Sequence, residues 1–343
     1  MKRLLNTLYV TSQGAYLAKD GDNVLVRVEQ ETRLRVPIHT LGGIVCFGQV
    51  SCSPPLMGLC GERNVTLSFL SEHGKFFARV HGPVSGNVLL RRAQYRYADN
   101  PEFSAEIARA IVVAKIANSR TVLLRAARER GDNESASILL DACAREARLL
   151  RELRQPLDLD TVRGKEGMAA KEYFDVFDHL ITSQKQDFVF KGRSRRPPLD
   201  NINALLSFMY TLLAHDVSSA LEAVGLDPAV GFLHRDRPGR PGLALDIMEE
   251  FRPYLADRLA LTLVNRKQVT AGEFVRSESG AVMMTDKGRK EILVTYQKRK
   301  QEEIQHPFLG EKVAIGLLPH VQAMLMARHL RGDLDGYPPF LWK

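Results

Sequence analysis

Hydrophobic and polar residues alternate along roughly the first 80 positions of the chain, which is typical of half-buried β-strands. Turn residues such as Asp20-Gly21 and Gly42-Gly43 separate the alternating runs. Ser53-Pro54-Pro55 predicts the start of a short helix that reaches about Arg63, because Ser can cap free amides and Pro has no amide to lose. The predicted strands of this small β domain are 4–10, 15–19, 24–28, 32–38, 44–50, 65–70 and 76–80.

Apolar residues recur every three or four positions from Phe103 onward, which indicates helices. The longest predicted helical stretches are 199–224 and 244–264, and a β-pair is predicted within 273–295. Gly and Pro residues mark a connection before this helical part. We therefore predict an α+β protein. The predicted order along the chain is a small N-terminal β-sandwich-like domain (1–85), a linker (86–100) and a larger, mainly α-helical catalytic domain (101–343).

The composition is that of a globular protein, with 45% hydrophobic and 26% charged residues among 343, and it argues against disorder and fibrous repeats. No apolar run of about 18 residues and no signal peptide are recognisable, so we expect a cytoplasmic protein without a membrane span. The four cysteines form no Cys-x-x-Cys pair and are interpreted as reduced thiols, which argues against structural zinc.

A formal charge of +8 favours a polyanionic partner if the basic residues gather on one face. Two segments, 184–196 and 285–300, carry a marked excess of Lys and Arg. Both are candidates for contacts with phosphate groups, and the alternative is an ordinary solvated surface. The candidate phosphate-binding residues are Lys191, Arg193, Arg195, Arg196, Arg252, Lys287, Arg289 and Lys290.

Common catalytic signatures are missing: the chain has no Gly-x-Ser-x-Gly elbow, P-loop or Gly-x-Gly-x-x-Gly fingerprint. What remains is chemistry by acids and histidine. Glu166 is expected near the start of a helix, and His234 precedes a Gly/Pro-rich loop. Asp246 and Glu249 are three residues apart and share a helix face.

One imidazole and two or three carboxylates form a set of ligands suited to Mn²⁺ or Mg²⁺, which can activate a phosphodiester for attack. The alternatives are structural: a helix-capping Glu, a solvated acidic face and a histidine without a metal. Composition and spacing alone leave this choice open.

Four sequence motifs, in the order given below, resemble the CRISPR-associated endonuclease that acts as the integrase of spacer acquisition. The N-terminal residues are most similar to its type I-C branch. The motifs are Glu166-Gly167-x-Ala169-Ala170-x-x-Tyr173-Phe174, Arg193-x-Arg195-Arg196-Pro197-Pro198-x-Asp200-x-x-Asn203, Gly231-Phe232-Leu233-His234 and Leu243-Ala244-Leu245-Asp246-Ile247-Met248-Glu249-Glu250-Phe251-Arg252-Pro253.

The resemblance implies that Glu166, His234 and Glu249 are catalytic and bind one metal ion, Mn²⁺ or Mg²⁺, with Asp246 as a second candidate ligand. It implies that a DNA 3′-hydroxyl attacks a phosphodiester of the CRISPR repeat, and that the same site nicks branched DNA. The basic residues above would bind double-stranded and branched DNA.

The expected partners are a second copy of the chain, which joins through the N-terminal domain in a homodimer, and a small ferredoxin-like protein of the adaptation module. Two other functions remain open from the sequence: a non-catalytic DNA-binding scaffold and a metal-dependent nuclease that prefers RNA.

Overall fold

The computed structural model describes residues 6–72, 76–80, 82 and 88–342, which divide into two compact units. Residues up to 86, together with 284–301, form the first unit. Residues 87–283 and 302–343 form the second. The predicted domain bounds stay a prediction, and the segment 284–301, which was assigned to the helical domain, groups here with the N-terminal residues.

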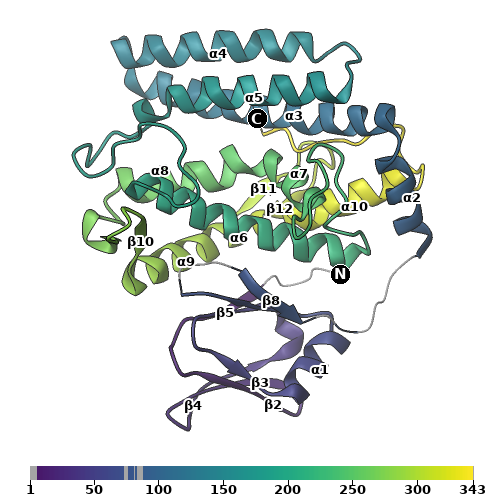
Figure 1. Ribbon diagram of the computed structural model, residues 1–343, viewed down its shortest axis with the longest axis vertical. Coiled ribbons are helices and arrows are strands. Elements are labelled where there is room, and N and C mark those ends of the chain that lie inside the picture. The colour runs from purple at the N-terminus through teal and green to yellow at the C-terminus, as the bar shows by residue number, and fades with distance from the viewer. Residues whose placement is uncertain (1–5, 73–75, 81, 83–87, 343) are drawn as a thin grey trace. The chain divides into compact units, whose positions relative to one another are not determined.

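Two four-stranded sheets form most of the first unit, as the alternating pattern predicts (Figure 1). One sheet has the strand order β1-β5-β7-β8, with β1, β5 and β7 parallel and β8 antiparallel. The other has the order β4-β3-β2-β6, with only β6 parallel to its neighbour. The strands are β1 (Asn6–Val10), β2 (Tyr16–Asp20), β3 (Asn23–Val28), β4 (Glu31–Pro37), β5 (Leu41–Phe47), β6 (Ser51–Cys52), β7 (Thr66–Leu70) and β8 (Phe76–Val80).

Apolar side chains of both sheets and of α1 (Pro54–Glu62) form the core of this unit, including Leu17, Ile44 and Leu56. The predicted cap is confirmed, since the Ser53 hydroxyl accepts a hydrogen bond from the Leu56 amide at 3.4 Å. The helix α9 (Asp286–Gln301) also belongs here, and the Gln297 side-chain amide donates to the Thr7 carbonyl at 2.8 Å. The first residues of the first predicted strand, 4–5, lie outside the described residues.

The long, buried helix α3 (Pro101–Arg130) runs through the second unit. It packs against α4 and α5, which lie beside it in Figure 1, and against α7, which in turn packs on α6. The other helices are α2 (Val88–Ala98), α4 (Glu134–Glu152), α5 (Leu159–Asp175), α6 (Asn201–Val224), α7 (Gly242–Phe251), α8 (Arg258–Asn265) and α10 (Leu318–Leu330). Short strand pairs are β9 (Phe274–Arg276) with β10 (Val282–Met284), as predicted, and β11 (Glu303–Gln305) with β12 (Lys312–Ala314).

The structure differs from the sequence interpretation at two connections. The predicted linker 86–100 contains the helix α2, because Leu90 and Gln94 are one turn apart and both are buried, while residues 86–87 lie outside the described residues. The predicted helix 244–264 is divided by a π-helical turn, η3 (Arg252–Asp257). Pro253 lacks the amide hydrogen that a regular α-helix requires, which favours the break.

One described helix, α6, has the length and mean hydropathy of a membrane span. Of its most apolar window, 67% is buried inside the protein, as in the core helix of a globular domain. Leu205, Leu206 and Leu213 are among its fully buried side chains, so protein packing explains the apolar composition.

Candidate active site

Glu166 lies in the middle of α5. The prediction from the sequence that it lies near the start of a helix is wrong. The helix begins two turns earlier at Leu159, where the Asp158 carboxylate accepts a hydrogen bond from the Thr161 amide at 2.9 Å. A capping role for Glu166 is thereby excluded. Its carboxylate points to α3, where it forms a hydrogen-bonded ion pair with Lys115.

The carboxylate of Asp246 holds His234 in place. It is fully buried in the middle of α7 and accepts hydrogen bonds from the backbone amides of Phe232, Leu233 and His234 at 2.6, 2.9 and 3.0 Å. The Nδ1 atom of His234 donates to the same carboxylate at 2.6 Å. Because Nδ1 carries the proton toward Asp246, the acceptor nitrogen of the neutral imidazole is Nε2.

This arrangement requires glycine at position 231. A Cβ atom there would lie 2.7 Å from a carboxylate oxygen of Asp246 and 2.6 Å from the backbone of Gly242. Such distances are too short for non-bonded carbon atoms, so only glycine lets the loop approach α7 this closely. The sequence motif before His234 therefore has a steric cause.

Glu166 and Glu249 meet at one buried ammonium group. Glu249, on α7, is almost fully buried, and its Oε2 atom lies 2.8 Å from Nζ of Lys115 on α3. Burial alone would raise the pKa of Glu249, but Arg252, Lys115 and His234 together lower it to about 2. Burial would likewise lower the pKa of Lys115, but Glu249 and Glu166 outweigh burial and raise it. Three helices thus place charged groups of both signs at one point.

Arg252 closes the other side of Glu249. Its guanidinium lies 2.9 Å from Oε1 of Glu249 and 4.7 Å from the centre of the Tyr210 ring. The Tyr210 hydroxyl donates to Asp257 at 2.6 Å. Burial raises the pKa of Asp257 to about 6, although the Tyr210 hydrogen bond and the nearby arginines oppose the increase. Arg252 was predicted to bind DNA, but its charge is engaged inside the protein.

The residues around Glu249 fit a divalent metal by their chemistry. No three His, Cys, Asp or Glu side chains in the described part of the chain form a preassembled cage. However, Oε2 of Glu249 is buried and makes no hydrogen bond, although Nζ of Lys115 lies 2.8 Å away. A buried oxygen of this kind needs a partner. Two carboxylates and a neutral imidazole nitrogen are donors that Mn²⁺ and Mg²⁺ accept.

Asp246 differs from the other acids, because both of its oxygens already accept hydrogen bonds. A carboxylate that holds the second nitrogen of a histidine orients the ring toward a metal on its other side. This geometry favours Asp246 as the residue that orients His234 and not as a ligand itself.

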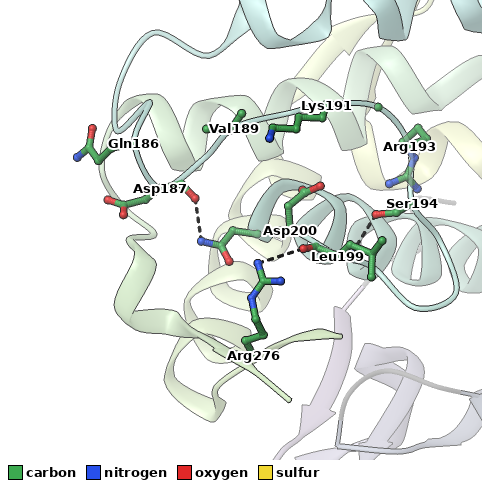
Figure 2. Close-up of a pocket in the computed structure, with 11 residues that line it drawn as sticks. Gln186, Asp187, Val189, Lys191, Arg193, Ser194, Leu199, Asp200 and Arg276 are labelled. Carbon is green, nitrogen blue, oxygen red and sulfur yellow. Dashed lines mark hydrogen bonds between the residues drawn. The ribbon is translucent and has the colours of Figure 1, made fainter. Parts of the chain in front are cut away.

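The first basic segment forms one wall of a cavity of about 620 Å³ (Figure 2). Arg276 of β9 lines this cavity and donates to the Leu199 carbonyl at 3.2 Å. The Leu199 amide donates to the Ser194 hydroxyl at 3.0 Å, which shapes the loop before α6. Lys191 lines the cavity and is exposed. The segment is therefore a folded surface next to a hollow.

The arginines of this segment have different surroundings. Arg195 and Arg196 are exposed. Arg193 is largely buried, donates to the Asn203 side chain and lies 5.2 Å from the centre of the Tyr210 ring. Burial lowers the pKa of Arg193. The exposed pair can reach a nucleic acid, whereas Arg193 supports the interior.

The second basic segment belongs to α9 of the first unit. Lys287 and Lys290 are exposed there. Arg289 is only 5% exposed and bonds to the Met284 carbonyl and to Asp286. Its predicted contact with DNA is not supported by this burial.

Lys115 was not identified from the sequence, although a signal was present. It stands within Val112-Val113-Ala114-Lys115-Ile116-Ala117, a lysine in an apolar run of a helix. Such a lysine is almost never buried unless it is paired. The partners Glu166 and Glu249 are distant in sequence, so only the fold identifies them.

Comparisons with known proteins connect this geometry to a family. A family model described as CRISPR associated protein Cas1 matches residues 8–298. A protein of Chlorobaculum tepidum called CRISPR-associated endonuclease Cas1 1 is 56% identical over 343 residues, which cover 100% of both chains.

Two solved structures have the same fold. The casposase bound to integration product has a TM-score of 0.82 at 22% identity, and the match covers 99% of this chain and 95% of that chain. A chain of the Cas6-RT-Cas1–Cas2 complex has a TM-score of 0.83 at 20% identity, and the match covers 100% of this chain and 36% of that one.

Proposed function

Since the chain belongs to the Cas1 family, we propose that it is a metal-dependent DNA endonuclease and integrase of CRISPR adaptation. Its full-length relative at 56% identity is called a CRISPR-associated endonuclease. The observation that carries the proposal is the meeting of Glu166 and Glu249 on one buried cation, together with His234 oriented by Asp246. The resemblance to the type I-C branch stays a prediction.

We propose Glu166, Glu249 and Nε2 of His234 as the groups that hold Mn²⁺ or Mg²⁺. Such an ion polarises a phosphoryl oxygen and stabilises charge on the transferred phosphoryl group. Asp246 accepts the Nδ1 hydrogen of His234, which fixes the orientation of the ring and makes Nε2 the nitrogen that can bind a metal. Arg252 lowers the pKa of Glu249 and so keeps this carboxylate ionised.

The proposed reaction exchanges one phosphodiester for another. The 3′-oxygen of the captured DNA forms a bond to phosphorus, and the bond between phosphorus and the 3′-oxygen of the repeat strand breaks. Attack by water in place of the 3′-hydroxyl would nick branched DNA. Lys191, Arg195 and Arg196 are exposed and would neutralise backbone phosphates beside the site.

For partners, we propose a homodimer that joins through the N-terminal unit, and a small ferredoxin-like protein of the adaptation module. A fold relative is described as part of a Cas1–Cas2 complex, which favours the second partner. The proposed location is the cytoplasm.

An integration assay with a supercoiled CRISPR plasmid tests the proposed function. The wild-type chain should join a DNA fragment to the plasmid when Mn²⁺ and the partner protein are present. Glu166→Ala and His234→Ala should reduce joining to background while DNA binding at moderate salt survives. Glu172→Ala is the matched control, because Glu172 lies on the same helix and pairs with Arg145.

Three outcomes would contradict the proposal. Undiminished joining by Glu166→Ala would remove Glu166 from the site. A wild-type chain that binds DNA but neither cuts nor joins it would be a scaffold. Cleavage of RNA in preference to DNA would indicate an RNA nuclease.

A further inference from the structure

Lys115 occupies the place between the two carboxylates that the proposed function assigns to a metal. Its Nζ atom forms a hydrogen-bonded ion pair with Oε1 of Glu166 and lies 2.8 Å from Oε2 of Glu249. A divalent ion bound to the same two oxygens must also lie between them. The ammonium group and the metal ion therefore compete for one position.

The formal charges around this position already balance. Glu166 and Glu249 contribute two negative charges, and Lys115 and Arg252 contribute two positive charges within ion-pair distance. A divalent cation gains little net attraction from a neutral cluster. Stable binding therefore requires that one of the resident cations moves away.

Of the two cations, Lys115 is the one that can leave. Arg252 is held by Glu249, three residues before it, and by the Tyr210 ring. Lys115 carries a single ammonium on a flexible four-carbon chain, and it forms ion pairs with the two carboxylates themselves. If both carboxylates bind a metal, the ammonium loses its partners and withdraws.

We propose that Lys115 is an internal counter-ion of the metal site. It pairs with Glu166 and Glu249 when no metal is bound, and a divalent ion must displace it in order to bind. The inference rests on the proposed function and adds a residue that weakens metal affinity while it stabilises the metal-free fold. An uncompensated pair of buried carboxylates would destabilise that fold.

Calorimetric titration with Mn²⁺ tests the displacement in the full-length protein stripped of metal. Lys115→Met retains the length and apolar stem of the side chain but removes the charge. We expect it to bind Mn²⁺ about tenfold more tightly than wild type, because no cation has to be displaced. The matched control is Lys165→Met, since Lys165 pairs with the exposed Glu152 and should leave the affinity unchanged.

Thermal unfolding gives a second readout that does not depend on activity. Metal-free Lys115→Met should unfold at a lower temperature than wild type, and saturating Mn²⁺ should raise its midpoint more than that of wild type. If the variant is unfolded without metal, folding induced by Mn²⁺ supports the counter-ion role. A variant that stays unfolded in saturating Mn²⁺ overturns it.

The outcomes separate this inference from the proposed function. Equal or weaker Mn²⁺ binding by Lys115→Met, with normal binding by wild type, overturns the counter-ion role alone. Failure of both proteins to bind Mn²⁺ overturns the metal site as well.

Discussion

Asp246 shows how one buried side chain can organise a site through the residues that it binds. Its carboxylate accepts three backbone amides and the Nδ1 hydrogen of His234. In asparagine, an NH₂ group replaces one of the two acceptor oxygens, and its hydrogens would face the N–H groups that Asp246 binds. The loop and the imidazole would then both lose their alignment. Asp246 thus links the shape of the loop to the orientation of a proposed metal ligand.

Asp246→Asn should lower Mn²⁺ affinity and the rate of strand transfer by about 10- to 100-fold, the usual cost of losing a group that orients a metal ligand. Mn²⁺ titration and an integration assay measure the two effects. Asp160→Asn is the control, because Asp160 is an exposed acid that pairs with Arg163 and Arg235. Equal loss in the control would contradict the specific role of Asp246.

Glu146, a buried acid away from the site, predicts a pH dependence of stability. Its Oε1 atom accepts the Ser119 hydroxyl at 2.7 Å, while Oε2 has no hydrogen bond. Burial raises its pKa from 4.5 to about 8, so the folded chain binds more protons than the unfolded chain between these values. Stability from this group is complete below pH 4.5 and is lost as the pH rises toward about 8.

Glu146→Gln removes this titration. The variant should gain stability relative to wild type as the pH increases across that range, measured as the difference between two thermal unfolding curves at each pH. Parallel pH profiles of the two proteins would show that Glu146 does not titrate with a raised pKa.

At the scale of elements, the loop before α6 divides its arginines between surface and interior. Reversal of the exposed pair, Arg195→Glu with Arg196→Glu, should weaken DNA binding and reduce the slope of log affinity against log salt by about two, one for each lost phosphate contact. Binding at several salt concentrations measures this slope. Arg331→Glu, an exposed site that pairs with Asp333, is the control. An unchanged slope in the double variant would remove the loop from the DNA interface.

Arg193 should behave differently from its neighbours. It is buried against Tyr210 and bonded to Asn203, so Arg193→Glu should mainly lower the unfolding temperature. The lost hydrogen bond and ring contact typically contribute about 2–4 kcal/mol together. Unfolding of the variant at the wild-type temperature would contradict this interior role.

At the scale of the whole molecule, the last described residues fasten several helices of the second unit together. The Tyr337 hydroxyl and the Phe340 amide both donate to Glu250, each at 2.7 Å, and the Trp342 amide donates to Asn118 at 2.8 Å. Arg125 and Arg258 lie 4.0 and 4.3 Å from the centre of the Trp342 ring. The tail thus connects α3, α7 and α8.

Truncation before Tyr337 should destabilise the second unit by about 3–5 kcal/mol, because it uncovers apolar surface and leaves buried polar groups without partners. Denaturant unfolding of the full chain and of the truncated chain measures the difference. Equal free energies of unfolding would show that the tail contributes nothing to the fold.

The sequence by itself determined where strands give way to helices, because a hydrophobic period of two or 3.6 residues depends only on the local chain. The same holds for the Ser53 cap and the course of α6, which both agree with their predicted positions. The motif around His234 also came from the sequence, but its reason, the close contact of Gly231 with Asp246, came from the structure.

Only the tertiary structure decided which charges meet. Lys115 and Glu166 are 51 residues apart, so the sequence around either residue does not predict their contact. The sequence assigned Arg252 and Arg289 to DNA, but the ion pair of Arg252 and the burial of Arg289 depend in the same way on the residues that pack around them. Helix periodicity is a property of a segment, whereas the environment of a charge is set by every segment that folds against it.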